Sequence, residues 1–155
     1  KNNIPVFLDP KVANRDLYRG HFITAMTPNT REAEDLVGGT SSDIDIIGRR
    51  ILANYGHQYV LITRGEHGMT LFDANSSSSS GIDCSVIHLP AVAKHVFDVA
   101  GAGDTVIAAL TLAYASEYSM LESAKIANLA AGVVVGKPGT AVCSKKELEE
   151  IYETV

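Results

Sequence analysis

A small, glycine-rich and acidic turn joins a strand-like segment to an apolar helical pattern over residues 98–111, and this run constrains the fold most. The first N–H groups of a helix lack backbone partners and carry partial positive charge, so they can bind an anion. We expect the N–H groups of Gly101, Ala102 and Gly103 to form such a site. Asp104 follows them, and a carboxylate beside a phosphate can take a proton from a hydroxyl. The turn therefore predicts a phosphoryl-transfer centre.

The length and charge of the chain exclude several classes of function. Its 155 residues suffice for one domain with a sizeable core. The net charge of −5 gives no basic surface, so we expect neither nucleic acid nor a membrane as partner. No apolar run approaches the ~20 residues that span a bilayer, and the start has no signal-peptide pattern. Cys84 and Cys143 share no motif spacing, which predicts free thiols in a reducing compartment, the cytoplasm.

Short apolar runs alternate with helical patterns along the chain, which predicts an α/β fold with three layers and a largely parallel sheet. The expected strands cover residues 4–9, 22–26, 59–63, 69–72 and 84–89, the last two as an antiparallel hairpin at an edge. We expect one helix to begin near Asn29 and a second after Asp43. A third should open near Ala102 and cover residues 105–115, and two more should cover residues 121–135 and 145–152. The serine-rich stretch 75–81 fits a solvated loop better than a phosphorylation cluster.

Asn29 and Glu32 stand three residues apart where a helix is expected to begin. This spacing fits a capping box, in which each side chain bonds the backbone N–H of the other residue. The same side chains share a face of the first turn and could orient water around Mg²⁺, which prefers oxygen ligands. Local evidence alone favours the capping box.

Further glycine-containing turns are candidate ligand contacts, each with a structural alternative. Thr63, Gly65 and Gly68 lie in a turn after a strand, where glycines let the backbone approach a ligand, but a plain hairpin turn fits equally. Asn128 fits a hydrogen-bonded buried amide of an apolar helix. The loop 136–140 fits a helix stop.

The D-x-x-G-A-G-D pattern of residues 98–104, followed by small and apolar residues, closely resembles the second signature of the ribokinase-like (PfkB) carbohydrate kinases. The resemblance implies a ribokinase-like fold. It also implies that the backbone of Gly101, Ala102 and Gly103 forms an anion hole and that Asp104 takes the proton from a sugar hydroxyl.

The same resemblance implies ATP and Mg²⁺ as cofactors. The family carries an N-x-x-E motif that matches Asn29 and Glu32, which implies that these residues hold Mg²⁺ through water and reverses the local preference. Asp98 is implied in a monovalent-cation site, with K⁺ as a candidate. The implied ATP contacts are Thr63, Gly65, Gly68, Asn128, Gly136 and Gly139.

Only the C-terminal, nucleotide-binding half of the family pattern matches residues 1–155, and the chain opens without Met. We therefore expect a fragment that lacks the sugar-binding half and, by itself, shows little sugar phosphorylation. A non-catalytic nucleotide-binding fragment is the alternative from another functional class.

Within the family, several runs resemble the bacterial heptose 7-phosphate kinases of ADP-heptose synthesis. These runs are residues 9–11, 18–20, 27–32, 104–107 and 130–141. The resemblance implies phosphorylation of the anomeric hydroxyl of heptose 7-phosphate for lipopolysaccharide core synthesis, with ribokinase or fructokinase activity as alternatives. It leaves open a homodimer and a fused nucleotidyltransferase domain in the parent protein.

Overall fold

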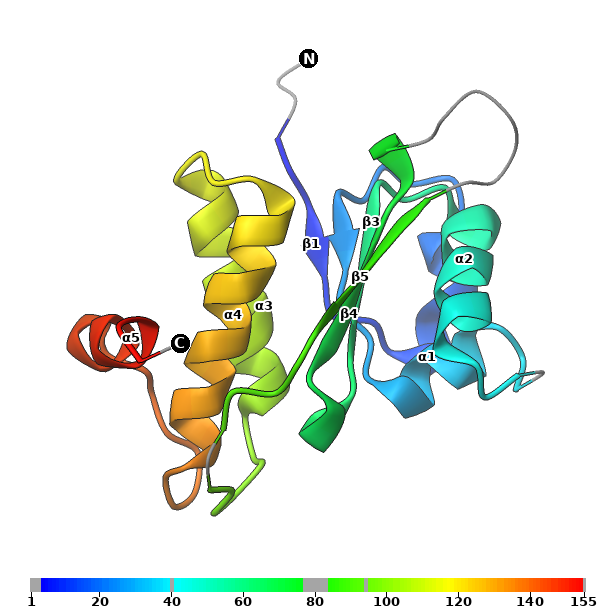
Figure 1. Cartoon of the computed structure of the whole chain (residues 1–155). Coiled ribbons are helices and arrows are strands. Elements are labelled where there is room, and N and C mark those ends of the chain that lie inside the picture. The colour runs from blue at the N-terminus through cyan, green and yellow to red at the C-terminus, as the bar shows by residue number, and fades with distance from the viewer. Residues whose placement is uncertain (1–3, 40, 77–83, 94, 155) are drawn as a thin grey trace. The chain divides into compact units, whose positions relative to one another are not determined.

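The computed structural model describes residues 4–39, 41–76, 84–93 and 95–154, and the chain divides into two compact units. The first unit comprises residues 1–64 and 69–88, and the second comprises residues 65–68 and 89–155. A sheet and the helices packed on it belong to the first unit, and the C-terminal helices belong to the second (Figure 1). The serine-rich run 77–81 lies outside the described residues.

A mixed sheet of five strands, in the order β1-β2-β3-β4-β5, forms the centre of the first unit. The strands β1, β2 and β3 run parallel, whereas β3 and β4 pair antiparallel and β5 lies beside β4. The bounds are Phe7–Leu8 for β1, Ala25–Met26 for β2, Tyr59–Thr63 for β3, Met69–Asp73 for β4 and Ser85–Leu89 for β5. The predicted α/β class is therefore confirmed.

The first two strands are shorter than the apolar runs 4–9 and 22–26 predicted. The Val6 N–H donates to the Thr24 hydroxyl at 2.9 Å, so a side chain takes the place of a backbone carbonyl there. Regular pairing begins at Phe7. Hydrophobic runs thus located both strands but overestimated their length.

Helices α1 (Thr30–Leu36) and α2 (Ile44–Tyr55) pack their apolar positions onto the sheet of the first unit. Asp43 caps α2 as predicted, because its carboxylate accepts the N–H groups of Asp45 and Ile46. A Cβ at Gly48 would overlap the ring of Phe72, so this glycine allows α2 to approach β4. The centre of this core comprises Met26, Ile47, Ile51, Val60, Ile62 and Phe72.

The second unit contains α3 (Ala102–Ala115), α4 (Met120–Val135) and α5 (Lys145–Tyr152). Buried small residues, Ala113, Ala124 and Ala127 among them, allow α3 and α4 to pack closely. Ser119 and Ser144 begin α4 and α5 with capping boxes. All three helices match the predicted segments, and the turn opens α3 at Ala102 as expected.

Short 3-10 helices connect several of these elements: η1 (Val12–Tyr18), η2 (Gly65–His67) and η3 (Ala74–Ser76). Both cysteines are free, as predicted. Among the described residues, every helix is too short or too polar to cross a bilayer.

Candidate functional site

The turn before α3 depends on a glycine at its centre. Gly101 is the N-cap residue of α3 and has a φ of 77°, a left-handed conformation that disfavours residues with a Cβ. A Cβ there would also lie 3.0 Å from Cγ2 of Thr140. The Gly101 carbonyl accepts both the N–H and the hydroxyl of Thr105 at 3.0 Å. The chain therefore enters α3 sharply, with its first N–H groups at the end of the turn.

The N–H groups of this turn differ in their hydrogen bonding. Ala102 donates to the Val99 carbonyl at 3.2 Å, so its amide closes the turn. Among the described residues, the N–H groups of Gly101, Gly103 and Asp104 have no hydrogen-bond partner. Three amides at the positive end of a helix of 14 residues are thus available to an anion. The predicted anion hole stays a prediction, with the Ala102 amide already engaged.

Asp104 lies in the first turn of α3, and its side chain is exposed. Neither an ion pair nor a hydrogen bond engages this carboxylate within the described part of the chain. A carboxylate without a cationic partner keeps both oxygens available to accept a proton. Asp104 therefore combines the properties that a general base requires with a position beside unpartnered amides.

The turn is attached to the loop after α4 by Asp98. One carboxylate oxygen of Asp98 accepts the Ala100 N–H at 2.9 Å, and the other accepts the Gly139 N–H at 3.2 Å. The Val135 carbonyl at the end of α4 accepts the N–H groups of Phe97 and Asp98. Asp98 is thus a structural link in the second unit, and its predicted role toward K⁺ stays a prediction.

Gly68 and Asn128 meet the same short segment after β5, although they are far apart in sequence. Gly68 has a φ of 76°, and a Cβ there would overlap backbone atoms of Leu89 and Ala91. Asn128 is buried and donates from Nδ2 to the Pro90 carbonyl at 2.7 Å. The buried amide is therefore satisfied, as its local pattern predicted, and the backbone at residues 89–91 is held from two sides.

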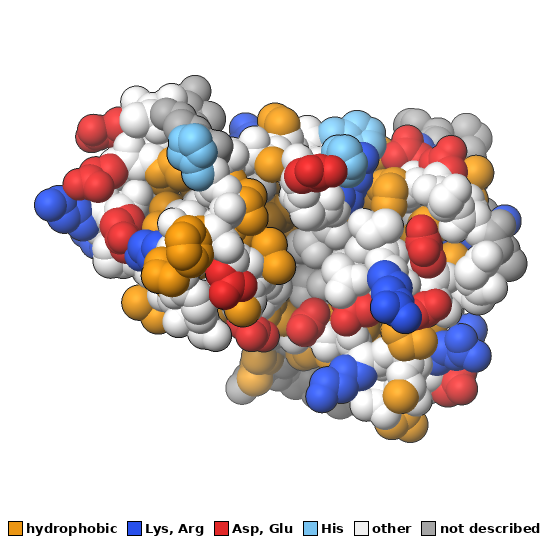
Figure 2. Space-filling model, turned by 90° about the horizontal axis from the view of Figure 1, so that it is seen from below, with side chains coloured by type: hydrophobic (Ala, Val, Ile, Leu, Met, Phe, Trp, Pro, Cys, Tyr) orange, Lys and Arg blue, Asp and Glu red, His pale blue; other side chains and the backbone are white. Residues whose placement is uncertain are grey.

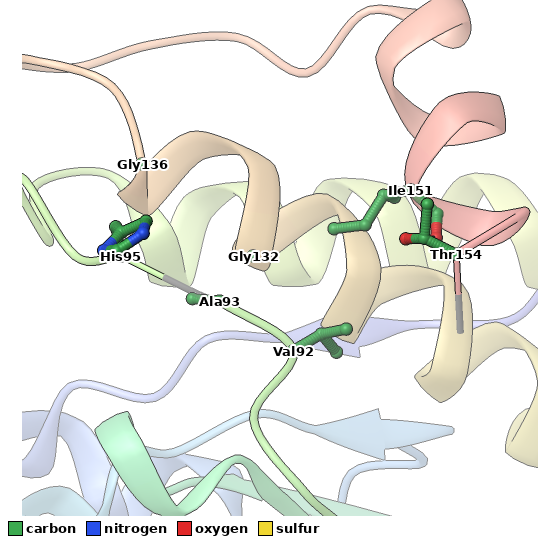
Figure 3. Close-up of a pocket in the computed structure, with 7 residues that line it drawn as sticks. All are labelled: Val92, Ala93, His95, Gly132, Gly136, Ile151 and Thr154. Carbon is green, nitrogen blue, oxygen red and sulfur yellow. The ribbon is translucent and has the colours of Figure 1, made fainter.

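A cavity of about 330 Å³ lies beside this segment in the second unit (Figure 3). Its size falls at the lower end of the range for small-molecule sites. Two glycines line it, Gly132 within α4 and Gly136 at the C-terminal end of this helix. Because neither has a side chain, the backbone itself forms part of the wall. The lining residues are Val92, Ala93, His95, Gly132, Gly136, Ile151 and Thr154. Of the predicted nucleotide residues, Gly136 therefore lines a cavity.

In the first unit, the ends of the parallel strands bring Asp9, Asn29 and Thr63 to one edge of the sheet. Asn29 and Glu32 form the predicted capping box, with bonds of 3.0 and 2.8 Å between each side chain and the backbone N–H of the other. Each side chain therefore uses one polar atom for the helix. Among the described residues, acidic, His and Cys side chains form no group of three or more that could hold a metal.

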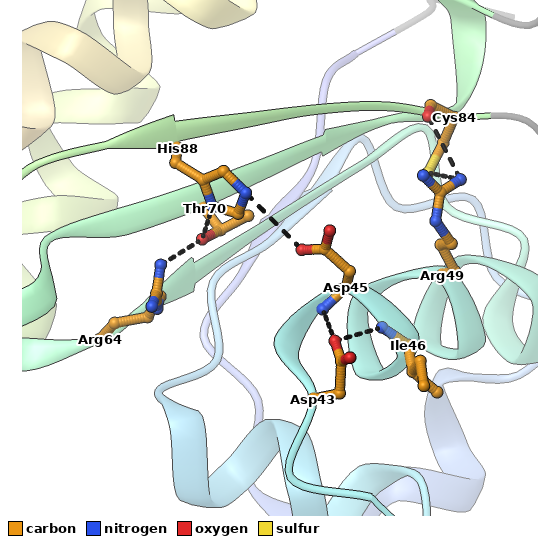
Figure 4. A network of polar contacts seen from close by, with 8 residues as sticks. All are labelled: Asp43, Asp45, Ile46, Arg49, Arg64, Thr70, Cys84 and His88. Carbon is orange, nitrogen blue, oxygen red and sulfur yellow. Dashed lines mark hydrogen bonds and ion pairs between the residues drawn. The ribbon is translucent and has the colours of Figure 1, made fainter.

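A polar network that the sequence analysis missed holds the residue after Thr63 (Figure 4). The Arg64 guanidinium donates to the Thr70 hydroxyl at 3.1 Å, and this hydroxyl lies 3.0 Å from Nδ1 of His88. Nε2 of His88 lies 3.8 Å from the Asp45 carboxylate. The alternation of side chains along β4 would have placed Thr70 on the same face as Phe72, but no local pattern pairs it with Arg64.

Lys137 and Glu147 are a second pair that the sequence analysis did not single out. The Lys137 ammonium lies 2.6 Å from the Glu147 carboxylate and also donates to the Val142 carbonyl at 2.7 Å. Glu147 is the third residue of the Ser144 capping box, and the Ser-x-x-Glu pattern was the signal that could have found it.

Figure 2 shows the face of the molecule that looks downward in Figure 1. Acidic and basic side chains are interspersed on this face, and blue side chains do not gather into one patch. This distribution agrees with the net charge of −5.

The pfkB family carbohydrate kinase model matches residues 1–147. The bifunctional protein HldE of Vibrio parahaemolyticus is 45% identical over 150 residues, which represent 96% of this chain and 29% of that protein. The chain therefore spans less than a third of the length of this curated relative.

Solved structures agree on the fold. Ribokinase of Thermotoga maritima matches with a TM-score of 0.82 at 21% identity, over 99% of this chain and 50% of that one. Arabidopsis thaliana ribokinase, in a complex with ribose and ATP, matches with a TM-score of 0.78 at 24% identity, over 96% and 47%. The predicted ribokinase-like fold is thus confirmed.

Proposed function

Because the chain belongs to the pfkB family of carbohydrate kinases, we propose that it is the C-terminal, nucleotide-binding part of an ATP-dependent sugar kinase. The observation that carries this proposal is the exposed, unpaired Asp104 carboxylate beside the unpartnered amides of Gly101 and Gly103 at the start of α3. Nucleotide binding alone does not need a base at such a position, whereas phosphoryl transfer to a hydroxyl does.

In the proposed reaction, Asp104 accepts the proton of the sugar hydroxyl while the hydroxyl oxygen forms a bond to the γ-phosphorus of ATP. The bond from this phosphorus to the bridging oxygen breaks, and ADP leaves with the electron pair. The N–H groups at residues 101 and 103 donate hydrogen bonds to the phosphoryl oxygens, which carry the charge. The proton on Asp104 passes to solvent after the phosphorylated sugar departs.

For the nucleotide, we propose the cavity as the site of the base and the glycine turns as its surroundings. Because Gly68 has no Cβ, the backbone of residues 89–91 can lie directly against it, and the Asn128 amide donates a hydrogen bond to the Pro90 carbonyl of the same segment. Gly136 lines the cavity and Gly139 is bonded to Asp98. Thr63 and Gly65 remain proposed contacts on the strength of the motif.

Asn29 and Glu32 are the residues we propose to hold Mg²⁺ through water. Their oxygen and amide groups at a helix start fit an ion that keeps several of its waters. When bound, Mg²⁺ neutralises charge on the phosphates. Asp98 has two carboxylate oxygens, each with one hydrogen bond, which supports a further interaction with a monovalent cation such as K⁺.

As the substrate we propose D-glycero-β-D-manno-heptose 7-phosphate, phosphorylated on its anomeric hydroxyl to the 1,7-bisphosphate for lipopolysaccharide core synthesis. The 45% identity to a bifunctional HldE protein supports this choice over other sugars of the family. The parent protein would then carry a second, nucleotidyltransferase domain and act in the cytoplasm.

The test is an assay of the full-length protein with Mg-ATP and heptose 7-phosphate, ribose, fructose or fructose 6-phosphate in separate reactions. Phosphorus NMR should show a new anomeric phosphate only with the heptose. Transfer to ribose, fructose or fructose 6-phosphate instead would retain the kinase and reject the heptose. Absence of transfer to every sugar, with ADP still bound, would favour a non-catalytic nucleotide-binding protein.

A further inference from the structure

Helix α5 supplies one wall of the cavity. Ile151 lies in the last turn of α5, Thr154 follows the C-cap residue of the helix, and both line the cavity. In Figure 3 the side chain of Ile151 extends toward Gly132 of α4. The family match ends at residue 147, so both residues lie outside it.

The opposite part of the wall is the end of α4, at Gly136, and one ion pair connects it to α5. Lys137 follows Gly136 directly, and its ammonium lies 2.6 Å from Oε1 of Glu147 on α5. The same ammonium donates to the Val142 carbonyl at 2.7 Å, in the segment between the two helices. Lys137 is thus bonded at two points, which fixes the start of α5 against the loop after α4.

Glu147 is itself held on both oxygens. Its Oε2 accepts the Ser144 N–H at 2.9 Å and the Ser144 hydroxyl at 2.7 Å, while Oε1 faces Lys137. The hydrogen bond from Lys137, followed by those from Ser144, lowers the pKa of Glu147 to about 2. The carboxylate is therefore charged throughout the physiological range and remains able to pair with Lys137.

The other ion pairs of α5 differ in kind. Lys145 pairs with Glu149 and Lys146 with Glu150, both at 3.6 Å and within the same helix. These side chains are largely exposed, and within the described part of the chain their ion pairs stay inside α5. Such pairs contribute little to stability, and they cannot set the distance between α5 and the loop. They provide matched controls for Glu147.

We propose that Ile151 contacts the base of the bound adenine nucleotide and that Lys137 and Glu147 are positioning residues that hold this wall of the pocket in place. The inference rests on the proposed function, because it takes the cavity as the site of the base. A flat base needs apolar surfaces on its faces, and Ile151 offers one while Gly132 leaves room beside it. Nucleotide affinity should therefore depend on α5, whereas the chemical step at Asp104 should not.

The test measures ADP binding by calorimetry and steady-state kinetics in ATP, with the full-length protein. Ile151→Ala should weaken ADP binding about fivefold to tenfold, since it removes apolar surface from the contact. Tyr152→Ala on the same helix is the control, because Tyr152 is 71% exposed and absent from the cavity wall. Ile151→Trp adds volume to the cavity instead of removing it, and it should also weaken ADP binding. If both variants weaken binding, loss of packing around a smaller side chain cannot be the whole cause.

Glu147→Gln and Lys137→Met should raise the KM for ATP about threefold to tenfold and leave kcat within about twofold, as expected for loss of one interaction that both ground and transition states share. Glu150→Gln removes an equal charge from α5 and should change neither constant. Lys137→Arg keeps the charge and should restore most of the affinity. Thermal unfolding of each variant should show that all remain folded.

Unchanged ADP affinity in both Ile151 variants would overturn the inference and leave the kinase assignment intact. An equal rise in KM for Glu147→Gln and Glu150→Gln would overturn the positioning role. A wild-type protein that binds no ADP would overturn the proposed function itself, and the inference with it.

Discussion

The Asp98 carboxylate accepts the backbone N–H of Gly139 at 3.2 Å, although 41 residues separate the two. Its other oxygen accepts the Ala100 N–H, within the turn that leads to Gly101. One side chain thus fixes both the entrance to α3 and the loop after α4. The position of the α3 amides therefore depends on a residue that contacts none of them.

Replacing Asp98 by Asn should separate this structural link from charge. Asn keeps one acceptor oxygen but presents an NH₂ group to the second N–H, so one of the two bonds is lost. We expect the free energy of unfolding to fall by about 1 kcal/mol. ADP binding should weaken in parallel. Asp98→Ala, which removes both bonds, should lower the free energy of unfolding and the ADP affinity more than Asp98→Asn does. Urea titration and calorimetry of the full-length protein give the two values, and equal effects of Asn and Ala would contradict the two-bond account.

Asp104→Asn tests the catalytic base. The amide has nearly the size and polarity of the carboxylate but cannot take the proton, so kcat should fall about 10²- to 10⁴-fold. ADP affinity should stay within about twofold, because the proposed base pocket lies among residues of α4 and α5. Retention of most of kcat would show that another group accepts the proton. Loss of ADP binding instead would indicate a structural or metal-binding role.

Gly68 and Gly65 form a matched pair in the turn between β3 and β4. Both have positive φ, 76° and 57°, but a Cβ at Gly65 meets open space while one at Gly68 overlaps the backbone of Leu89. Gly65→Ala should therefore cost about 1–2 kcal/mol, the price of the left-handed conformation. Gly68→Ala should cost more, since the segment 89–91 must also move. Urea unfolding measures both values. Equal free energies of unfolding for the two variants would show that residues 89–91 can move away from Gly68 without a measurable cost.

Local signals explain why much of the fold could be predicted from the sequence. The start of α1 is encoded by Asn29 and Glu32, three residues apart, and the start of α2 by Asp43. Each signal acts within one helical turn, so it does not depend on the rest of the structure. The glycine run before α3 is local in the same sense, and the helix begins at Ala102 as predicted.

The connections between elements could not be predicted in this way. Asp98 was assigned to a cation by resemblance, and nothing near it in the sequence indicated its bond to Gly139. The link from Lys137 to Glu147 joins a loop to a helix, and no periodicity relates the two residues. Such contacts depend on how the elements pack in three dimensions. A hydrophobic pattern identifies the buried face of a helix, but it does not determine which residues of a neighbouring element that face meets.

His57 should make the protein less stable as the pH falls. Its side chain is 3% exposed, both ring nitrogens lack a hydrogen-bond partner among the described residues, and the ring stacks on Tyr55 at 5.7 Å. Burial lowers the pKa of His57 to about 4, from 6.5 in the unfolded chain. Between these values the unfolded state binds more protons than the folded state, so the free energy of unfolding decreases as the pH drops from 6.5 toward 4. At pH 5 the loss from this residue should be about 2 kcal/mol relative to pH 7.

His57→Phe keeps the stacked ring and removes the titration, so its unfolding free energy should change about 2 kcal/mol less between pH 7 and pH 5 than that of the wild type. Urea unfolding of both full-length proteins at the two pH values measures this difference, and identical pH dependence would mean that the buried ring acquires a partner when it is protonated.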